Sequence, residues 1–336
     1  MRDIQNKEKR SSVEMNDALL RVTDLKTYFF LRRGIVKSVN GVSFSLKKGE
    51  ILGLVGESAC GKTVTGLSIL RLVPDPPGKI VGGHVYFEGQ DLLTKSEEEM
   101  RRLRGYKITM IQQNPDSSLN PVFRIGDQVS EAIATCQEID KKERWEKAIE
   151  MLHLVRIASP GLRALEYPHQ MSGGMRQRVA GAIALSCEAN LLIADEPTTS
   201  LDVTTQLEYL KLLGEIQRKT GVAIVFITHD FGIVERICDR IAVMYAGRIV
   251  ETGPTTYVTK KPIHPYTMAL LDSVPKPGSK GDLLRSIEGQ PPDPVNLPEN
   301  CAFAPRCSRA DTRCLNELPE ETVIDSQRSV RCFHAG

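Results

Sequence analysis

The sequence predicts an α/β fold in which parallel strands are covered by helices on both faces. Three short segments are almost wholly apolar and are separated by helical stretches: residues 191–194, 223–228 and 241–245. Strands that are buried on both faces have this composition, and their alternation with helices is typical of a parallel sheet. A chain of 336 residues is also long enough to hold more than one domain.

The first part of the chain is expected to add a tail and an antiparallel sheet. Residues 1–17 are polar and without periodicity, which predicts a mobile tail. Apolar residues then alternate or cluster over 19–22, 25–30 and 42–46, with turn residues between them, as in an antiparallel sheet. The short apolar run at 51–55 predicts the first buried strand of the α/β fold.

The later segments predict one large domain followed by an extension. Residues 73–83 are rich in Pro and Gly and predict a connection. An amphipathic pattern around Trp145 places an α-helical subdomain at about 114–180. We therefore expect one α/β domain over 18–255 and a small, irregular, cysteine-containing extension over 256–336.

The composition excludes several classes of protein. Lys+Arg 44 against Asp+Glu 42 leaves a nearly neutral chain, so neither nucleic acid nor an acidic membrane surface is expected as the main partner. No apolar run approaches the roughly 18 residues that span a bilayer, and the N-terminus is too polar for a secretory signal. We therefore expect a protein of the cytoplasm.

A phosphate-binding loop is predicted directly after the strand at 51–55. Gly56 and Gly61 let the backbone curl so that successive N–H groups point at phosphate oxygens, helped by the positive end of the following helix. Lys62 would reach the β- and γ-phosphates, and the Thr63 hydroxyl would bind Mg²⁺. A Gly-rich turn can match this pattern by chance, but the flanking strand and helix favour a nucleotide site. The loop consists of Gly56, Glu57, Ser58, Ala59, Cys60, Gly61, Lys62 and Thr63.

Two carboxylates and a histidine follow predicted strands, where open α/β sheets bind their ligands. Asp195 suits Mg²⁺, directly or through water, and Glu196 would act as the general base that polarises water in ATP hydrolysis. His229 can hydrogen-bond a γ-phosphate. The alternatives are a helix N-terminus that favours acidic residues and a histidine satisfied within a core or turn.

A second anion-binding device lies at the start of a predicted helix, with Ser172 as its N-cap. One chain cannot easily bring this device and the phosphate loop onto one γ-phosphate, whereas two chains facing head to tail can. We therefore expect ATP to bind between two subunits. The device consists of Ser172, Gly173, Gly174 and Met175.

These motifs, in this order, resemble those of the ATP-binding cassette (ABC) proteins over about residues 18–253. The resemblance identifies residues 56–63 as the Walker A motif, 191–196 as Walker B and 172–175 as the signature motif. It implies a P-loop NTPase domain with an antiparallel β subdomain and an α-helical subdomain. The signature departs from its commoner form by having methionine on both sides of the Ser-Gly-Gly, which leaves the phosphate-facing residues intact.

The same resemblance implies roles for residues outside these motifs. Gln113 would be the Q-loop glutamine, which senses Mg²⁺, Asp202 a residue of the D-loop, and His229 the switch histidine. Phe29 falls where the family places its adenine-stacking aromatic side chain. The residues alone leave open a core position for Phe29, with Tyr28 or Phe30 taking its place against adenine.

The extension resembles that of the ATPases of oligopeptide and dipeptide importers, through residues 264–267, 287–292 and 301–307. The resemblance implies an ATP-hydrolysing subunit on the cytoplasmic face of the membrane that energises peptide import, or import of nickel or another solute as in close relatives. It also implies a paralogous ATPase subunit in a heterodimer, two transmembrane permease subunits and, indirectly, an extracytoplasmic peptide-binding protein. The sequence itself leaves a homodimer open.

Two other functions fit parts of the sequence. A soluble mechanical ATPase of the DNA-repair or ribosome-associated kind carries a long coiled coil or two cassettes per chain, and this sequence has neither. A regulatory module that hydrolyses ATP slowly and senses redox state through its cysteines is the second alternative.

Four of the eight cysteines crowd into the last 36 residues, separated by five, six and seventeen residues. Disulfides are disfavoured in a reducing compartment, and the close pair usual for structural zinc is absent. Four thiolates on a Pro-rich segment can ligate a [4Fe–4S] cluster, which we expect as a structural staple, with zinc or free thiols as alternatives. The four are Cys301, Cys307, Cys314 and Cys332.

Arginines precede three of these cysteines, and the other cysteines are scattered. Arg306, Arg313 and Arg331 would favour the thiolate form of the next residue and offset the charge of a cluster, or are merely surface charges. Small buried apolar positions are expected for the scattered ones: Cys60, Cys136, Cys187 and Cys238.

Overall fold

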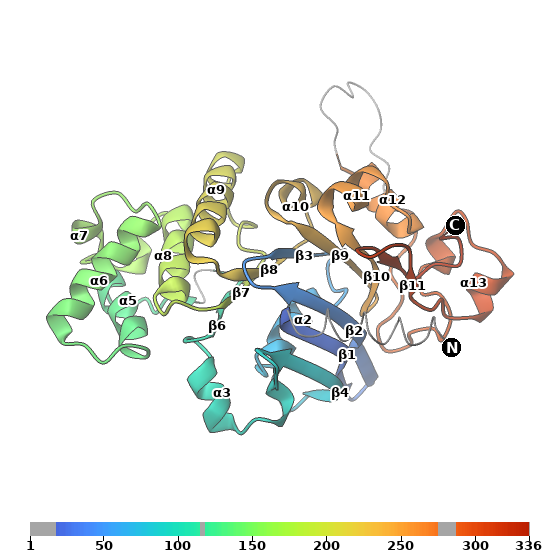
Figure 1. Cartoon of the computed structure of the whole chain (residues 1–336), viewed down its shortest axis with the longest axis horizontal. Helices are drawn as coiled ribbons and strands as arrows, with labels where there is room; N and C mark the ends of the chain where they lie inside the picture. Colours follow the sequence, from blue (N-terminus) through green and yellow to red (C-terminus); the bar gives the residue numbers. More distant parts are fainter. Residues whose placement is uncertain (1–17, 115–117, 275–286, 336) are drawn as a thin grey trace. The chain divides into compact units, whose positions relative to one another are not determined.

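The computed structural model describes residues 18–114, 118–274 and 287–335, so the tail expected at 1–17 lies outside the described residues. The chain forms two compact units (Figure 1). Unit 1 contains the described residues up to 47, then 51–94 and those from 228 onward. Unit 2 contains residues 48–50 and the described part of 95–227.

Unit 1 holds the predicted antiparallel sheet. Its strands are β1 (Ala18–Leu31), β2 (Gly34–Lys47), β4 (Gly78–Phe87) and β5 (Gln90–Asp91), in the order β2-β1-β4-β5. The two segments expected at 19–22 and 25–30 form the single strand β1, because a register shift between them keeps both paired with β2. The prediction of this sheet is confirmed.

The expected connection at 73–83 is shorter than predicted. Residues from Gly78 onward already belong to β4, which pairs with β1 from Phe29↔Gly78 to Leu20↔Phe87. Glycines marked this stretch as a turn, but here they allow close approach: a Cβ on Gly83 would lie 2.5 Å from the backbone oxygen of Asp24. The tight packing of two backbones therefore replaces the expected loop.

Unit 1 also contains the strand that leads into the phosphate loop. β3 (Ile51–Val55) pairs in parallel with β9 (Arg240–Tyr245), and β9 pairs antiparallel with β10 (Arg248–Pro254). Every residue of β3 is buried, as expected for a strand covered on both faces. Among the described residues of unit 1, the helical segments are α2 (Lys62–Ile69), η1 (Leu92–Thr94), α10 (Phe231–Ile237), α11 (Thr255–Lys260), α12 (Pro265–Asp272), η3 (Ala304–Arg306) and α13 (Thr312–Asn316).

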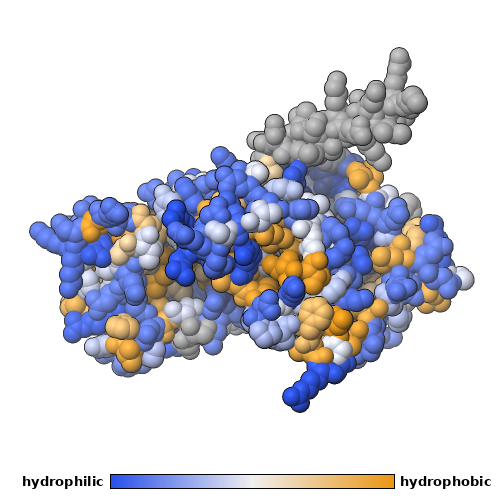
Figure 2. Space-filling view, turned by 90° about the horizontal axis from the view of Figure 1, so that it is seen from below, coloured by the Kyte–Doolittle hydropathy of each residue, from blue (hydrophilic) through white to orange (hydrophobic). Residues whose placement is uncertain are grey.

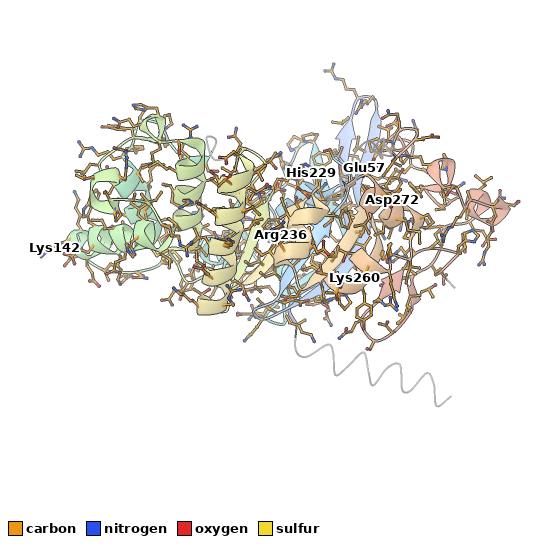
Figure 3. All side chains as sticks on the ribbon, turned by 90° about the horizontal axis from the view of Figure 1, so that it is seen from above. Glu57, Lys142, His229, Arg236, Lys260 and Asp272 are labelled. Atoms are coloured by element: carbon orange, nitrogen blue, oxygen red, sulfur yellow. A yellow bond between two sulfur atoms is a disulfide. The ribbon has the colours of Figure 1, made fainter. Side chains whose placement is uncertain are left out.

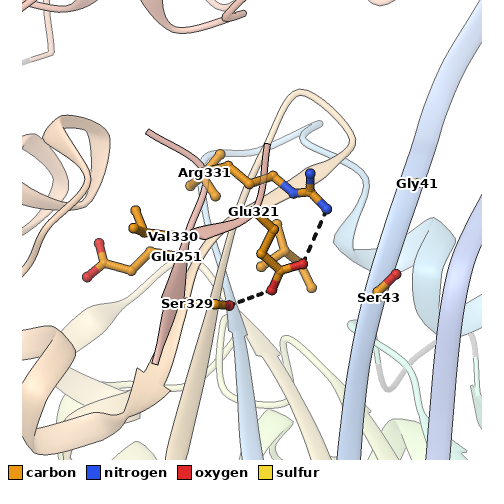
Figure 4. Close-up of a pocket in the computed structure, with 9 residues that line it drawn as sticks. Gly41, Ser43, Glu251, Glu321, Ser329, Val330 and Arg331 are labelled. Carbon is orange, nitrogen blue, oxygen red and sulfur yellow. Dashed lines mark hydrogen bonds and ion pairs between the residues drawn. The ribbon is translucent and has the colours of Figure 1, made fainter. Parts of the chain in front are cut away.

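The extension adds two short strands to this sheet. β12 (Ser329–Val330) pairs antiparallel with β10, and β11 (Thr322–Val323) pairs with β12. Glu321 holds the edge together, because its carboxylate accepts a hydrogen bond from the Ser329 hydroxyl at 2.5 Å and faces Arg331 at 3.4 Å (Figure 4). The segment expected to be irregular thus contains regular elements that share a sheet with β3.

Unit 2 contains the predicted parallel strands. β6 (Ile108–Ile111), β7 (Leu191–Asp195) and β8 (Ala223–Thr228) pair in parallel in the order β8-β7-β6. Every residue of β7 and β8 is buried, which explains their apolar composition. In the described part of this unit, the helical segments are α3 (Glu97–Leu103), α5 (Ile125–Ala134), α6 (Lys141–Leu154), α7 (Pro160–Arg163), η2 (Pro168–Gln170), α8 (Gly173–Leu185) and α9 (Val203–Thr220).

The indole ring of Trp145 in α6 packs against the start of α5. A Cβ on Gly126 would lie 2.5 Å from Cη2 of Trp145 and 2.9 Å from the Cβ of Ala164. Gly126 is therefore the residue that lets α5 approach the indole ring of α6. The backbone N–H of Gly126 also donates to the Ala164 oxygen at 2.8 Å, which ties the start of α5 to the end of α7.

Cys136 and Cys187 form a disulfide with a sequence separation of 51 residues. The expectation that both are small buried apolar residues is wrong, because the two are bonded to each other. Cys136 lies just beyond α5 and Cys187 just beyond α8, so the two C-terminal helix ends lie next to each other. The sequence gives no sign of this proximity, because nothing in the spacing of the two residues indicates that the helix ends meet.

Apolar side chains are also found on the surface of the β1–β2 hairpin. Phe30, Leu31 and Ile35 are 49%, 38% and 43% exposed. Figure 2 shows apolar patches among a mainly polar surface on the face seen from below. Among the described residues, none of the helices combines the length and apolar character needed to cross a bilayer.

Candidate functional site

The phosphate loop connects the buried strand β3 to helix α2. A Cβ on Gly56 would lie 2.1 Å from the backbone oxygen of Met244, and one on Gly61 would lie 2.1 Å from that of Ser38. Gly61 also has a φ of 106°, in the region that favours glycine. Both glycines are therefore required by the close approach of neighbouring backbone.

Lys62 crosses back over this loop. Its buried Nζ donates to the backbone oxygens of Gly56 at 2.7 Å and Glu57 at 2.9 Å. Thr63, the next residue, is exposed at the first turn of α2. A cavity of about 250 Å³ adjoins the loop, and its lining includes residues 57–60 of the loop and 291–294 of the extension.

Asp195 and Glu196 stand at the end of β7, as predicted. Asp195 is 3% exposed, whereas Glu196 follows it with a φ of 44°. The Oε2 atom of Glu196 accepts hydrogen bonds from Nε2 of Gln113 at 3.0 Å and from the Thr199 hydroxyl at 2.9 Å. Gln113 and Glu196 meet because β6 and β7 are parallel, with Ile111 opposite Ala194. Both strands therefore end at the same edge of the sheet.

The Ser-Gly-Gly turn caps helix α8, as predicted. The Ser172 hydroxyl accepts the backbone N–H of Met175 at 3.3 Å. A Cβ on Gly174 would lie 2.7 Å from Cγ2 of Thr205, which places the turn against the first turn of α9. Asp202 caps α9 by accepting from the backbone N–H groups of Thr204 and Thr205, and the hydrogen bonds from Thr205 lower the pKa of Asp202.

A cavity of about 420 Å³ opens at this turn within unit 2. Arg156 and Arg178 line it beside the Ser-Gly-Gly residues, and both also contact glutamates: Arg156 with Glu215 at 2.7 Å, Arg178 with Glu208 at 2.8 Å. Backbone N–H groups at a helix start, flanked by guanidinium groups, form a surface suited to an anion.

His229 and Phe29 both lie in unit 1. His229 is exposed directly after β8, before the Asp230 cap of α10 (Figure 3). Phe29 is partly buried in β1, and a Cβ on Gly78 would lie 2.8 Å from its Cε1 atom. The ring therefore packs on bare backbone, and its predicted role toward adenine stays a prediction.

The extension contacts the phosphate loop through two residues that the sequence did not single out for this purpose. The Tyr266 hydroxyl accepts the backbone N–H of Glu57 at 2.9 Å. Arg306 donates to both carboxylate oxygens of Glu57, at 2.7 and 3.0 Å. The pKa of Arg306 is raised, chiefly by the hydrogen bonds to Glu57. No signal in the sequence pairs residues 249 positions apart.

The four clustered cysteines carry no disulfide in the described structure. The Sγ atoms of Cys307 and Cys332 each accept a backbone N–H at 3.4 Å, from Arg309 and His334 respectively. Charge–charge interactions connect these thiols. Cys301 interacts with Cys314 and Cys332, and both Cys314 and Cys332 interact with Cys307. The four thiols therefore lie near enough to one another to interact electrostatically.

Burial and other partners, more than the preceding arginines, set the environment of these thiols. Burial raises the pKa of Cys301, Cys314 and Cys332. Arg306 turns its guanidinium to Glu57, and Arg313 places its guanidinium 4.0 Å from the centroid of the Phe333 ring. The neighbouring positive charges therefore serve contacts other than the thiols they precede.

His334 is a further candidate ligand that the cysteine pattern did not reveal. Its Nε2 atom lies 3.6 Å from Sγ of Cys314 and 3.5 Å from a carboxylate oxygen of Asp311. Ligand atoms of these three residues all lie within 4.8 Å of one another. The short sequence Cys332-Phe333-His334 was the available signal.

Comparison with known proteins gives consistent results along the chain. Residues 39–199 match the family described as ABC transporter, and residues 250–314 match the oligopeptide/dipeptide transporter C-terminal region. The chain is 45% identical to the dipeptide transport ATP-binding protein DppD of Bacillus subtilis, over 94% of this chain and 95% of that protein. It is 48% identical to the oligopeptide transport ATP-binding protein OppD of the same organism, over 87% and 82% respectively.

Solved structures of similar fold are also cassette proteins. The bacterial ABC transporter cassette MJ0796 matches with a TM-score of 0.64 and 25% identity, over 70% of this chain and 98% of that one. The cbiO1 protein of Clostridium perfringens, part of an ABC transporter complex, matches with a TM-score of 0.62 and 27% identity, over 74% and 93%.

Proposed function

This chain belongs to the ABC transporter family, and from that premise we propose that it hydrolyses ATP to drive an importer of dipeptides or oligopeptides. The observation that carries the proposal is the extension: it matches the oligopeptide/dipeptide transporter region and contacts the phosphate loop directly. Relatives named for dipeptide and oligopeptide transport align with nearly the whole chain. An importer of nickel or another solute is the alternative.

ATP would bind with its phosphates in the loop at residues 56–63 and its adenine on Phe29. Backbone N–H groups of the loop and the start of α2 would bind phosphate oxygens, and Lys62 would exchange its contacts with loop carbonyls for the β- and γ-phosphates. Mg²⁺ would be held by Thr63, Gln113 and Asp195, whose hydroxyl, amide and carboxylate oxygens it prefers, and would neutralise phosphate charge.

Hydrolysis would use Glu196 as general base. The carboxylate accepts a proton from water as the water oxygen attacks the γ-phosphorus, and the bond to the leaving ADP oxygen breaks. The hydrogen bond from Gln113 fixes the direction of this carboxylate, and His229 would contact the γ-phosphate. Ser172 to Met175 and Asp202 of a second subunit would complete the site, because the cavity at this turn suits an anion.

The assembly would be a heterodimer with a paralogous ATPase subunit, or a homodimer, bound to two permease subunits on the cytoplasmic face of the membrane. An extracytoplasmic peptide-binding protein would deliver the solute. Uptake of labelled dipeptides by vesicles that contain this chain, its partner subunit and the permeases tests the proposal. ATP-dependent uptake is expected, and vesicles that hydrolyse ATP but accumulate only another solute, such as nickel, would contradict the peptide assignment.

We further propose a [4Fe–4S] cluster on Cys301, Cys307, Cys314 and Cys332. The fit rests on four side chains gathered on one segment and on N–H groups that donate to two of the sulfur atoms, as cluster thiolates accept. Zinc is the alternative. The cysteine spacing does not favour zinc, but the proximity of Asp311 and His334 to Cys314 does.

Metal analysis decides between these ligands. Protein purified without oxygen should be brown, with about four iron and about four sulfide per chain. Colourless protein with one equivalent of zinc would overturn the cluster. If the site holds an iron–sulfur cluster, replacing His334 by alanine should leave the iron content unchanged. If the site holds zinc, the same replacement should lower the zinc content.

A further inference from the structure

The tightest contact between the extension and the phosphate loop is made by Arg306. Its side chain is 4% exposed, and its guanidinium forms a two-point contact with Glu57, at 2.7 and 3.0 Å. The remaining donors reach the Tyr245 hydroxyl at 3.3 Å and the backbone oxygens of Glu288 and Ile287 at 3.0 and 3.4 Å. This arrangement fixes the guanidinium from both sides.

Glu57 needs such a partner because of where it lies. It is the second residue of the loop, between Gly56 and Ser58, and its carboxylate is only 26% exposed. A triphosphate in the loop would bring several negative charges close to this carboxylate. Like charges that are partly removed from water repel strongly, whereas a fork-shaped guanidinium contact cancels the charge and fixes its position.

We propose that Arg306 is a positioning residue for ATP: it neutralises Glu57 and so keeps the phosphate loop able to accept a triphosphate. The inference rests on the proposed ATP binding and adds a role for the extension in it. Arg306 acts through Glu57 and does not itself touch the nucleotide. The extension thereby becomes part of the nucleotide site, since its residues 291–294 also line the cavity beside the loop.

The chain offers a matched control in Arg313. Like Arg306, it lies in the extension and directly precedes a cysteine of the cluster. Its side chain is 59% exposed and its ion pair with Glu317 lies on the surface. A substitution of Arg313 therefore removes the same charge next to the same cluster without touching the loop.

The experiment measures ATP binding by isothermal titration to the full chain in EDTA, which prevents turnover. Arg306→Ala should weaken binding about tenfold, because Glu57 is left as an uncompensated carboxylate. Arg306→Lys should weaken it less, since one positive charge remains without the fork. Arg313→Ala should bind within about twofold of the unmodified chain, as expected for a surface ion pair.

Removing the charge of Glu57 shows whether Arg306→Ala weakens ATP binding through electrostatic repulsion or through damage to the fold. Glu57→Gln placed in the Arg306→Ala chain should restore most of the lost affinity, and the loss should shrink in about 0.5 M salt. Arg306→Ala binding that equals that of the unmodified chain, or a double variant as weak as Arg306→Ala alone, would overturn the inference. An unmodified chain that fails to bind ATP would instead overturn the proposed function and this inference together.

Discussion

Nε2 of Gln113 and Oε2 of Glu196, 83 residues apart in the sequence, are joined by a hydrogen bond of 3.0 Å. The pair links the ends of two neighbouring parallel strands, so any change at Gln113 reaches the proposed base directly. A movement of the Gln113 side chain would therefore change the direction of the Glu196 carboxylate.

Glu196→Gln should lower the rate of ATP hydrolysis at least about a hundredfold, because an amide cannot accept the proton of the attacking water. ATP binding should persist, since the phosphate loop is unchanged. Phosphate release and ATP titration measure the two quantities. Glu150→Gln, an exposed site on α6, is the control, and unchanged turnover in Glu196→Gln would rule out the assigned base.

Tyr266→Phe should weaken ATP binding by about threefold to tenfold. The substitution removes the hydroxyl that accepts the backbone N–H of Glu57 and leaves that N–H without its partner inside the protein, at a cost of about 1 kcal/mol. Tyr257→Phe is the control, because Tyr257 is 50% exposed on α11. Equal affinities for the two variants would show that the contact does not shape the loop.

Gly126→Ala should lower the free energy of unfolding of unit 2 by about 1–3 kcal/mol, because the new methyl group would overlap the Trp145 ring at 2.5 Å. The chain has one tryptophan, so its fluorescence reports this region alone during denaturation. Gly161→Ala in α7 is the control, since nothing lies within 4 Å of its added Cβ. A midpoint shift of the same size in both would contradict the packing argument.

The stability of unit 1 should fall on acidification because of His264. Burial lowers its pKa from the ordinary 6.5 to about 4, so between these values the unfolded chain binds more protons than the folded one. The contribution is complete above about pH 6.5 and is lost as the pH falls toward 4. Between pH 7 and pH 5 the free energy of unfolding should drop by about 2 kcal/mol from this residue.

His264→Asn isolates this effect, because asparagine can still cap α12 in place of the imidazole. Burial raises the pKa of the neighbouring Glu251, which changes stability with the opposite sign but is common to both proteins. Denaturant titrations at pH 7 and pH 5 should therefore show a smaller drop in the variant. Parallel pH dependence in the two proteins would contradict the prediction.

The sequence predicted an element correctly where the element's own residues show whether it is buried or binds a ligand. Residues 51–55 and 191–194 are apolar throughout because both faces are covered, and Gly56, Lys62 and Ser172 lie where their motifs predict. Parallel pairing of β6 and β7 then brings Gln113 to Glu196 without further information. Spacing and composition suffice for such features because the sheet itself sets the geometry.

Contacts between distant segments were not predictable in the same way. Arg306 directly precedes Cys307 in the sequence, yet its side chain pairs with Glu57. Cys136 and Cys187 share no motif in the sequence, yet two helix ends bring them together. In both cases the packing of distant elements determines which residues meet, and one sequence alone does not reveal that packing.

The pairing of β12 with β10 has a consequence for solubility. Val330, 1% exposed, lies opposite Glu251, and the Arg331 N–H donates to the Val250 oxygen at 2.8 Å, so the end of the chain covers a strand edge. An uncovered edge offers unpaired N–H and C=O groups to other molecules. A chain that ended before Thr322 would therefore be expected to stack edge to edge and aggregate, which makes these last residues a guard against self-association.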